Sequence, residues 1–199
     1  MCKISGKYVI LLGAALIMSA LFLTVHNGSE DQLAGMEATQ MKEKVKEKVQ
    51  EKIKISENSI SRPDTVLDPE LPKVKIDGYD YVGYISVPAI QIELPVMAEW
   101  DYPRLKKAPC RQFGSSRTDD LVIAAHNYRS HFGRLKELET GDEVVFTDME
   151  GIVNTYTVEK TQVLEPASVE LVENSGYDLV LYTCTYGGKS RVCVFCDRE

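Results

Sequence analysis

The order of apolar and polar positions divides the chain into an apolar opening run, a charged segment and a region of strand-like alternation. Residues 8–25 are apolar and uncharged over 18 positions, near the shortest length that spans the hydrocarbon core of a bilayer. Lys3 and Lys7 precede this run and favour a cytoplasmic N-terminus made of residues 1–7. Because no small-residue cleavage pattern follows Val25, we predict a retained transmembrane anchor instead of a cleaved signal peptide.

The charged segment at residues 26–73 has the pattern of a stalk. Val45, Val49 and Ile53 recur at every fourth position and form one thin apolar stripe on a helix. Oppositely charged residues three positions apart cover the rest of this helix and indicate exposure to solvent. A solvated helical spacer is the simplest interpretation, and a weak coiled coil is the alternative. Three prolines within residues 61–73 then predict an extended linker.

Residues 74–199 have the alternation of a β-domain. The predicted strands cover residues 81–87, 90–97, 121–125, 144–147, 155–164, 179–182 and 191–195. The fourth and fifth of these segments form a predicted hairpin. Phe132, Leu135 and Leu138 share one face of a short predicted helix, which Gly141 ends. Many short strands with few helices predict a mainly β fold, a closed or nearly closed barrel.

Composition narrows the classes of function. The apolar fraction of 44% permits a sizeable core, and the formal net charge of -7 argues against nucleic acid as a partner. The cysteines are Cys2, Cys110, Cys184, Cys193 and Cys196. Their odd number leaves at least one thiol free or paired with another molecule, and they are sparser than in scaffolds that depend on disulfides. We expect Cys2, ahead of the apolar run, to be a cytoplasmic thiol with no special role.

Three polar residues stand at ends of predicted strands, where a sheet can hold a side chain that stays open to substrate. Cys184 follows the strand at 179–182. Because only the thiolate is a nucleophile, it needs a nearby positive charge that lowers the thiol pKa. His126, at the end of the strand at 121–125, could supply that charge and act as acid and base. Arg191 begins the next strand and could stabilise an oxyanion.

Each member of this trio also has an ordinary structural interpretation. A cysteine at a strand end is more often a small buried residue, and an arginine at a strand start is more often a surface charge. His131 is the rival of His126 as the base. We expect His131 to be a solvated residue in the first turn of the short helix, and we favour His126 because it ends a strand.

The pair Cys193 and Cys196 allows a metal or redox interpretation. On an extended strand, positions three apart face opposite sides of the sheet, which suits neither a chelate nor a bridge. Cys110 and Cys184 are not spaced as a second ligand pair. We therefore expect no zinc at this pair, and a thiol oxidoreductase built on it stays a minor alternative.

Several motifs together resemble the sortase family over about residues 80–197. They are Val180-Leu181-Tyr182-Thr183-Cys184 with Arg191 following, Val122-Ile123-Ala124-Ala125-His126-Asn127, then Phe132 and Leu135, then Gly141-Asp142, and the opening strands Gly83 to Pro88 and Leu94 to Val96. The family carries these motifs in the same order behind a membrane anchor. Ala125 and Val180 depart from the residues that the family usually has there. Both stand beside the reacting groups, so we expect neither to abolish activity.

The resemblance implies a sortase-like closed β-barrel of about eight strands with short helices, behind an N-terminal transmembrane helix. It implies that Cys184 attacks an LPXTG-like sorting signal of a surface protein and forms a thioacyl-enzyme. An amine of a peptidoglycan precursor or a pilin lysine then resolves the intermediate. His126 would exchange protons with both amines, Arg191 would hold the oxyanion or the substrate backbone, and Thr183 is a weaker candidate for lining the substrate pocket.

The resemblance also implies a catalytic domain on the outer face of the cell membrane, with a single-pass anchor and no cofactor. Some sortases bind calcium near the segment that corresponds to residues 164–178. Here Glu165, Glu170 and Glu173 lack ordered ligand spacing, so we expect a solvated acidic face. A non-catalytic barrel that only binds an extended peptide is the second function that the sequence leaves open.

Overall fold

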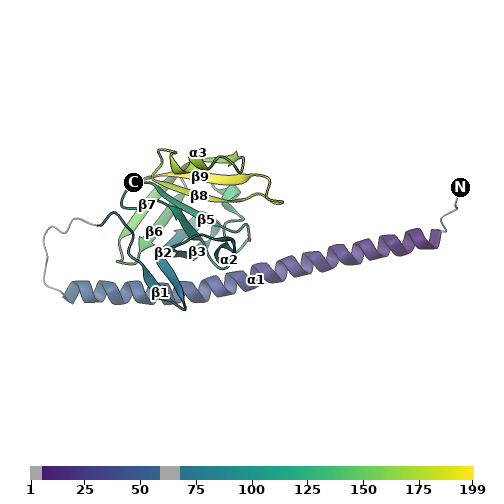
Figure 1. Cartoon of the computed structure of the whole chain (residues 1–199), viewed down its shortest axis with the longest axis horizontal. Coiled ribbons are helices and arrows are strands. Elements are labelled where there is room, and N and C mark those ends of the chain that lie inside the picture. Colours follow the sequence, from purple (N-terminus) through teal and green to yellow (C-terminus); the bar gives the residue numbers. More distant parts are fainter. Residues whose placement is uncertain (1–5, 59–67) are drawn as a thin grey trace.

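The computed structural model describes residues 6–58 and 68–199. One long helix, α1 (Gly6–Asn58), extends well past the β-domain, and its apolar N-terminal part lies away from that domain (Figure 1). By length and composition the apolar part of α1 could cross a membrane, and none of its most apolar window is buried by the rest of the protein. Cys2, Lys3 and most of the predicted linker at 61–73 lie outside the described residues.

The β-domain is a closed mixed barrel. The strands are β1 (Val74–Ile76), β2 (Tyr79–Val87), β3 (Ile92–Met97), β4 (Cys110–Phe113), β5 (Leu121–Ala125), β6 (Glu143–Asp148), β7 (Val153–Leu164), β8 (Leu179–Cys184) and β9 (Arg191–Arg198). The sheet order is β1-β2-β3-β4-β5-β8-β9-β7-β6, and a pairing of β2 with β6 closes it into eight strands with β1 added on β2. The predicted barrel of about eight strands is confirmed, with β6 and β7 forming the expected hairpin.

Closure of the barrel depends on a glycine in β2. Gly83 pairs with Asp148 of β6, next to an irregularity in the β2–β3 register. A Cβ atom at Gly83 would lie 2.1 Å from the carbonyl oxygen of Thr147, and the φ angle of +153° is one that other residues rarely adopt. Any side chain here would push β6 away from β2.

The strands that carry the candidate site are buried on both faces. All five residues of β5 are buried. Leu121 and Ile123 face the main core, whereas Val122 and Ala124 pack into two smaller clusters outside the barrel. A continuous apolar run is what a strand covered on both sides requires. This burial fixes the strand that ends at His126.

The connections are short. They contain η1 (Pro88–Ile90), α2 (Tyr102–Leu105), η2 (Leu135–Glu137) and α3 (Val169–Glu173). The helix predicted around Phe132 is wrong in kind, since only the three-residue 3-10 turn η2 forms there. Phe132, Leu135 and Leu138 are nevertheless buried in the main core, so the apolar pattern came from packing against the barrel.

The charged half of α1 packs along the barrel beside β1, β2 and β3 (Figure 1). Val45 and Val49 are buried in one cluster with Tyr81 and Met97, and Ile53 lies against Gly151. Lys42 and Lys46 of α1 both form ion pairs with Glu93 of β3. Their side-chain nitrogens lie 3.2 Å and 2.5 Å from the Glu93 carboxylate oxygens. The interpretation of this stripe as a solvated spacer is therefore wrong. The stripe faces the chain's own barrel.

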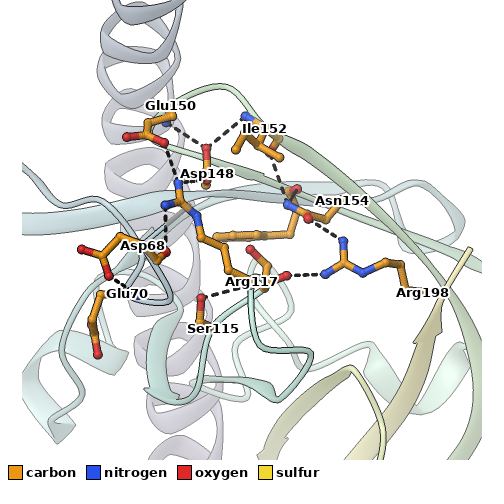
Figure 2. Close-up of polar contacts among 11 residues, drawn as sticks. Asp68, Glu70, Ser115, Arg117, Asp148, Glu150, Ile152, Asn154 and Arg198 are labelled. Atoms are coloured by element: carbon orange, nitrogen blue, oxygen red, sulfur yellow. Dashed lines mark hydrogen bonds and ion pairs between the residues drawn. The ribbon is translucent and has the colours of Figure 1, made fainter. Parts of the chain in front are cut away.

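The barrel end at the start of β5 carries a polar network, here called the Arg117–Asp148 network (Figure 2). Arg117 donates to the carboxylates of Asp148 at 2.9 Å and Glu150 at 2.6 Å, and to the carbonyl oxygen of Asp68 at 3.0 Å. Asp148 is fully buried, and its second oxygen accepts the main-chain N–H groups of Glu150 and Ile152. The network ties the β4–β5 loop to the β6–β7 turn.

Candidate active site

Strand pairing brings Cys184, His126 and Arg191 to one end of the barrel. Strands β5 and β8 run parallel, with Ala125 opposite Thr183, so His126, directly after β5, and Cys184, the last residue of β8, lie at the same edge of the sheet. Strands β8 and β9 run antiparallel, with Cys184 directly opposite Arg191. The three residues singled out in the sequence therefore lie at the ends of three adjacent strands. Cys184 and Arg191 line one cavity, whereas His126 lines a separate hollow beside α1.

A cavity of about 210 Å³ opens beside Cys184 and Arg191. Its other lining residues are mostly apolar or aromatic and come from α2, β4, β5, β7, α3, β8, β9 and the loops before α2 and α3: Trp100, Tyr102, Leu105, Gln112, Ala124, Ala125, Leu164, Glu165, Pro166, Ser168, Val172, Tyr182 and Cys193. An apolar cleft with a few polar groups is the usual form of a substrate site.

His126 occupies the loop that follows β5 and is partly buried. Its ring packs on the Tyr128 ring with 4.0 Å between centroids, and its buried Nδ1 has no hydrogen-bond partner in the described part of the chain. Burial, and then the positive charge of Lys106, hold the pKa of His126 below its ordinary value, against the opposing pull of Glu30 and Asp31. The imidazole is therefore mostly neutral at pH 7 and free to take a proton.

Arg191 is held by the main chain of the Cys184 loop. One guanidinium nitrogen donates to the carbonyl oxygens of Gly188 and Ser190, both at 3.1 Å. The Thr185 N–H donates to the carbonyl of Ser190 at 2.9 Å and narrows the loop to a tight turn. None of the carboxylates whose side chains the structure describes, a set that leaves out Glu170, lies within ion-pair distance of Arg191, so its charge stays available to a substrate oxygen.

Thr183 is buried, and its hydroxyl donates to the carbonyl oxygen of Ala125 at 2.9 Å. This bond ties β8 to β5 directly before Cys184 and His126. Thr183 is not among the residues that line the cavity. Thr183 therefore holds strands β8 and β5 in register.

The comparisons with known proteins agree with this geometry. A family model for the sortase domain matches residues 85–199. This chain belongs to the sortase family. Sortase A of Bacillus anthracis is 26% identical over 167 residues, which cover 80% of this chain and 77% of that relative. The family is one of cysteine transpeptidases that act on surface proteins.

Solved sortase structures have the same fold. Sortase C1 of Streptococcus suis superposes with a TM-score of 0.53 and 27% identity, covering 60% of this chain and 73% of that one. The sortase D5 transpeptidase of Clostridium perfringens gives a TM-score of 0.60 over 82% of this chain and 99% of that one, at 19% identity. Sortase C of Streptococcus pneumoniae gives 0.57 over 81% and 95%, at 24% identity. The last two likenesses concern the fold alone.

The other described cysteines of this sortase are buried. Cys193 lines the cavity and Cys196 faces the main core, which confirms that the two point to opposite sides of β9. Burial raises the pKa of Cys193 to about 11, and those of Cys110 and Cys196 to about 12. Among the cysteines that the structure describes, Cys184 alone is more than marginally exposed.

His131 differs from its predicted environment. The side chain is fully buried, and it lies in a turn beside the main chain of Ala34 in α1 and Leu105 in α2. Burial lowers its pKa to about 4. The prediction of a solvated first-turn residue is wrong, because it took no account of α1 covering this side of the barrel.

Sequence reasoning missed the aromatic lining of the cavity. Tyr182 stands two positions before Cys184 on the same face of β8, and its hydroxyl donates to the side-chain oxygen of Gln112 in β4. The alternation of strand residues was sufficient to find Tyr182. Nothing in the sequence pattern around Trp100 or Gln112 marks either residue as part of the site.

Proposed function

We propose that this sortase is a membrane-anchored cysteine transpeptidase in which Cys184 cleaves an LPXTG-like sorting signal. One observation carries the proposal. Cys184, the least buried described cysteine, lines an apolar cavity opposite Arg191, and the parallel pairing of β5 with β8 puts His126 at the same end of the barrel. A barrel that only binds peptides has no use for this combination.

In the proposed reaction the Cys184 thiol gives its proton to the neutral imidazole of His126, and the resulting thiolate attacks the carbonyl carbon of the threonine in the sorting signal. The carbon–sulfur bond forms, the amide C–N bond breaks, and the imidazolium of His126 gives its proton to the leaving amine. An acceptor amine then attacks the thioester, His126 takes up the amine's proton, and the thiolate leaves. Arg191, held by the main chain of its own loop, stabilises the oxyanion in both steps.

The proposed partners follow from this chemistry. The donors are surface proteins that carry the sorting signal, and the acceptor is an amine of a peptidoglycan precursor or a pilin lysine. Residues 1–7 lie in the cytoplasm and residues 8–25 span the membrane. Residues 26–73 connect this span to the extracellular catalytic domain at residues 74–199. Asp31 follows the span by six residues, about 9 Å along a helix. The site thus faces the membrane surface, where an anchored donor arrives.

Turnover by the full-length protein in detergent tests the proposal. A panel of sorting peptides is incubated with an amine acceptor, and the amide product is measured for the wild type, Cys184→Ala and Cys193→Ala. We expect product from the wild type and Cys193→Ala, and none from Cys184→Ala. Amide product from Cys184→Ala would refute the mechanism, and peptide binding with no product from the wild type would favour the non-catalytic barrel.

A further inference from the structure

The loop that carries His126 is held by a helix from outside the barrel. Residues 126–131 leave β5 and pass under α1, close to Glu30, Asp31 and Gly35. The contact joins parts of the chain that are about 100 residues apart in sequence. Helix α1 therefore forms part of the surroundings of His126, the candidate base.

Asp31 makes most of this contact. Its carboxylate accepts the main-chain N–H groups of Arg129 at 3.1 Å and Ser130 at 2.9 Å. The Ser130 hydroxyl donates to the same carboxylate at 2.5 Å and to the Asp31 carbonyl oxygen at 3.0 Å. A single carboxylate that accepts two successive main-chain N–H groups fixes the path of the loop, as a capping residue does at a helix end.

A second contact leads from α1 to the His126 ring. The Tyr128 hydroxyl donates to a carboxylate oxygen of Glu30 at 3.4 Å, and the Tyr128 ring lies against His126. Small residues also let α1 approach the barrel closely. A Cβ atom on Gly35 would lie 2.8 Å from the Cβ of Ser130, and Ala38 is buried in the main core.

Asp31 also belongs to the charged surroundings of His126. The titratable and charged groups around the ring are Glu30 and Asp31 from α1, Lys106 from the segment after α2, Tyr128, Arg129 and His131 from its own loop, and Tyr186 from the loop after β8. The two carboxylates favour the imidazolium form and Lys106 opposes it. The carboxylates thus partly offset the burial of the ring.

We propose that Asp31 of the anchor helix is a positioning residue for His126, so that the active site is complete only when α1 is docked on the barrel. The proposal rests on the proposed function, because it assigns His126 the role of acid and base. Asp31 touches no reacting atom. It holds the Arg129–Ser130 main chain and thereby the direction of the imidazole next to Cys184.

Two substitutions separate the geometric from the electrostatic part of this role. Asp31→Ala removes both the acceptor and the charge, whereas Asp31→Asn keeps an oxygen that can accept the N–H of Ser130. We expect kcat to fall about 10- to 100-fold in Asp31→Ala with little change in KM, and Asp31→Asn to recover most of that loss. In both variants the limb of the pH–kcat/KM profile that belongs to His126 moves to lower pH, because a charge that raises its pKa is gone.

Glu93→Gln is the matched control. It weakens the ion pairs of α1 with β3 at Lys42 and Lys46 and makes no contact with the His126 loop. We expect it to leave the pH profile unchanged and kcat within about twofold of the wild type. Ser130→Ala, which removes one side-chain donor and keeps the main-chain N–H, serves if Asp31→Ala fails to fold. One lost hydrogen bond predicts a fall in kcat of about 2- to 12-fold.

All variants are compared as full-length protein in detergent, with the fluorescence of Trp100 as the check on folding. An active wild type with kcat unchanged in Asp31→Ala and Ser130→Ala overturns the positioning role and leaves the proposed function standing. Higher activity in Asp31→Ala overturns it in favour of an inhibitory helix. A wild type with no activity on any peptide refutes the proposed function itself.

Discussion

The two ends of strand β5 carry polar residues in opposite states. At its start, Arg117 and Asp148 are buried and bonded to each other and to the surrounding main chain (Figure 2). At its end, His126 has a buried ring nitrogen with no partner in the described chain, and Arg191 donates to two main-chain carbonyl oxygens with no ion pair to any described carboxylate. The Arg117–Asp148 pair stabilises the fold, because removing either partner leaves a buried charge uncompensated. Groups left unsaturated on a rigid frame are available for chemistry.

Among the substitutions that test the difference between the two ends of β5, we expect His126→Ala to have the largest effect on activity. We expect His126→Ala to lower turnover by about 10²- to 10⁴-fold, the usual contribution of a general acid and base. The free energy of unfolding should fall by no more than about 1.5 kcal/mol, because the ring loses its packing on Tyr128 but gives up no side-chain hydrogen bond at Nδ1. Peptide turnover and urea unfolding measure the two effects. A large loss of stability with normal turnover would reverse the assignment of the two ends.

Replacement at the other end of β5 should have the opposite result. Asp148→Ala leaves Arg117 without its buried partner, so we expect the free energy of unfolding to fall by about 3–5 kcal/mol. Glu150→Gln, which removes the more exposed partner of the same arginine, should cost less than about 1 kcal/mol. The fraction of Asp148→Ala that stays folded should turn over like the wild type. Equal effects of both substitutions would contradict the buried network.

Arg191 tests whether the charge at the site end acts in catalysis. We expect Arg191→Ala to lower kcat by about 10²- to 10³-fold, as the loss of one oxyanion donor does. Lys189→Ala removes an exposed cation from the same loop and should have little effect. Steady-state kinetics at matched ionic strength distinguish the two variants. Similar losses of kcat in both variants would mean that Arg191 adds only general positive charge and does not contact the oxyanion.

His131 predicts a loss of stability in acid. Its pKa is about 4 in the folded protein and about 6.5 when unfolded, so the unfolded state binds more protons between these values. The contribution is fully present above pH 6.5, and about 3 kcal/mol is lost as the pH falls from 6.5 to 4. His131→Leu removes this titration and should flatten that part of the stability–pH curve. The same slope in the wild type and the variant would disprove it.

The sequence was sufficient for features that depend on local pattern. Alternating or β-branched segments located β2, β3 and β7 to within a few residues, a continuous apolar run located β5, and His126, Cys184 and Arg191 stand at strand ends as predicted. It missed β4, because Cys110–Phe113 is short and its residues do not alternate in polarity. The position of α1 was also missed, because the stripe of Val45 and Val49 has the same period whether it meets another helix or a sheet.

Long-range contacts explain the remaining errors. His131 is buried by Ala34, which lies nearly 100 residues earlier, and the Arg117–Asp148 pair joins two loops with no shared motif. Asp31 bonds to Ser130 at a similar separation. In each case one partner appears as an ordinary surface polar residue in its own sequence segment. Only the closed barrel with α1 docked on it brings the partners together.

The central claim is that Cys184 forms a covalent thioacyl intermediate. The full-length protein is incubated with a sorting peptide in the absence of any amine, quenched in acid, digested and examined by mass spectrometry. The account predicts an acyl adduct on the peptide that contains Cys184, none on those with Cys110, Cys193 or Cys196, and its disappearance when an amine is added. An adduct on another cysteine, or amide product formed with no adduct at Cys184, would contradict it.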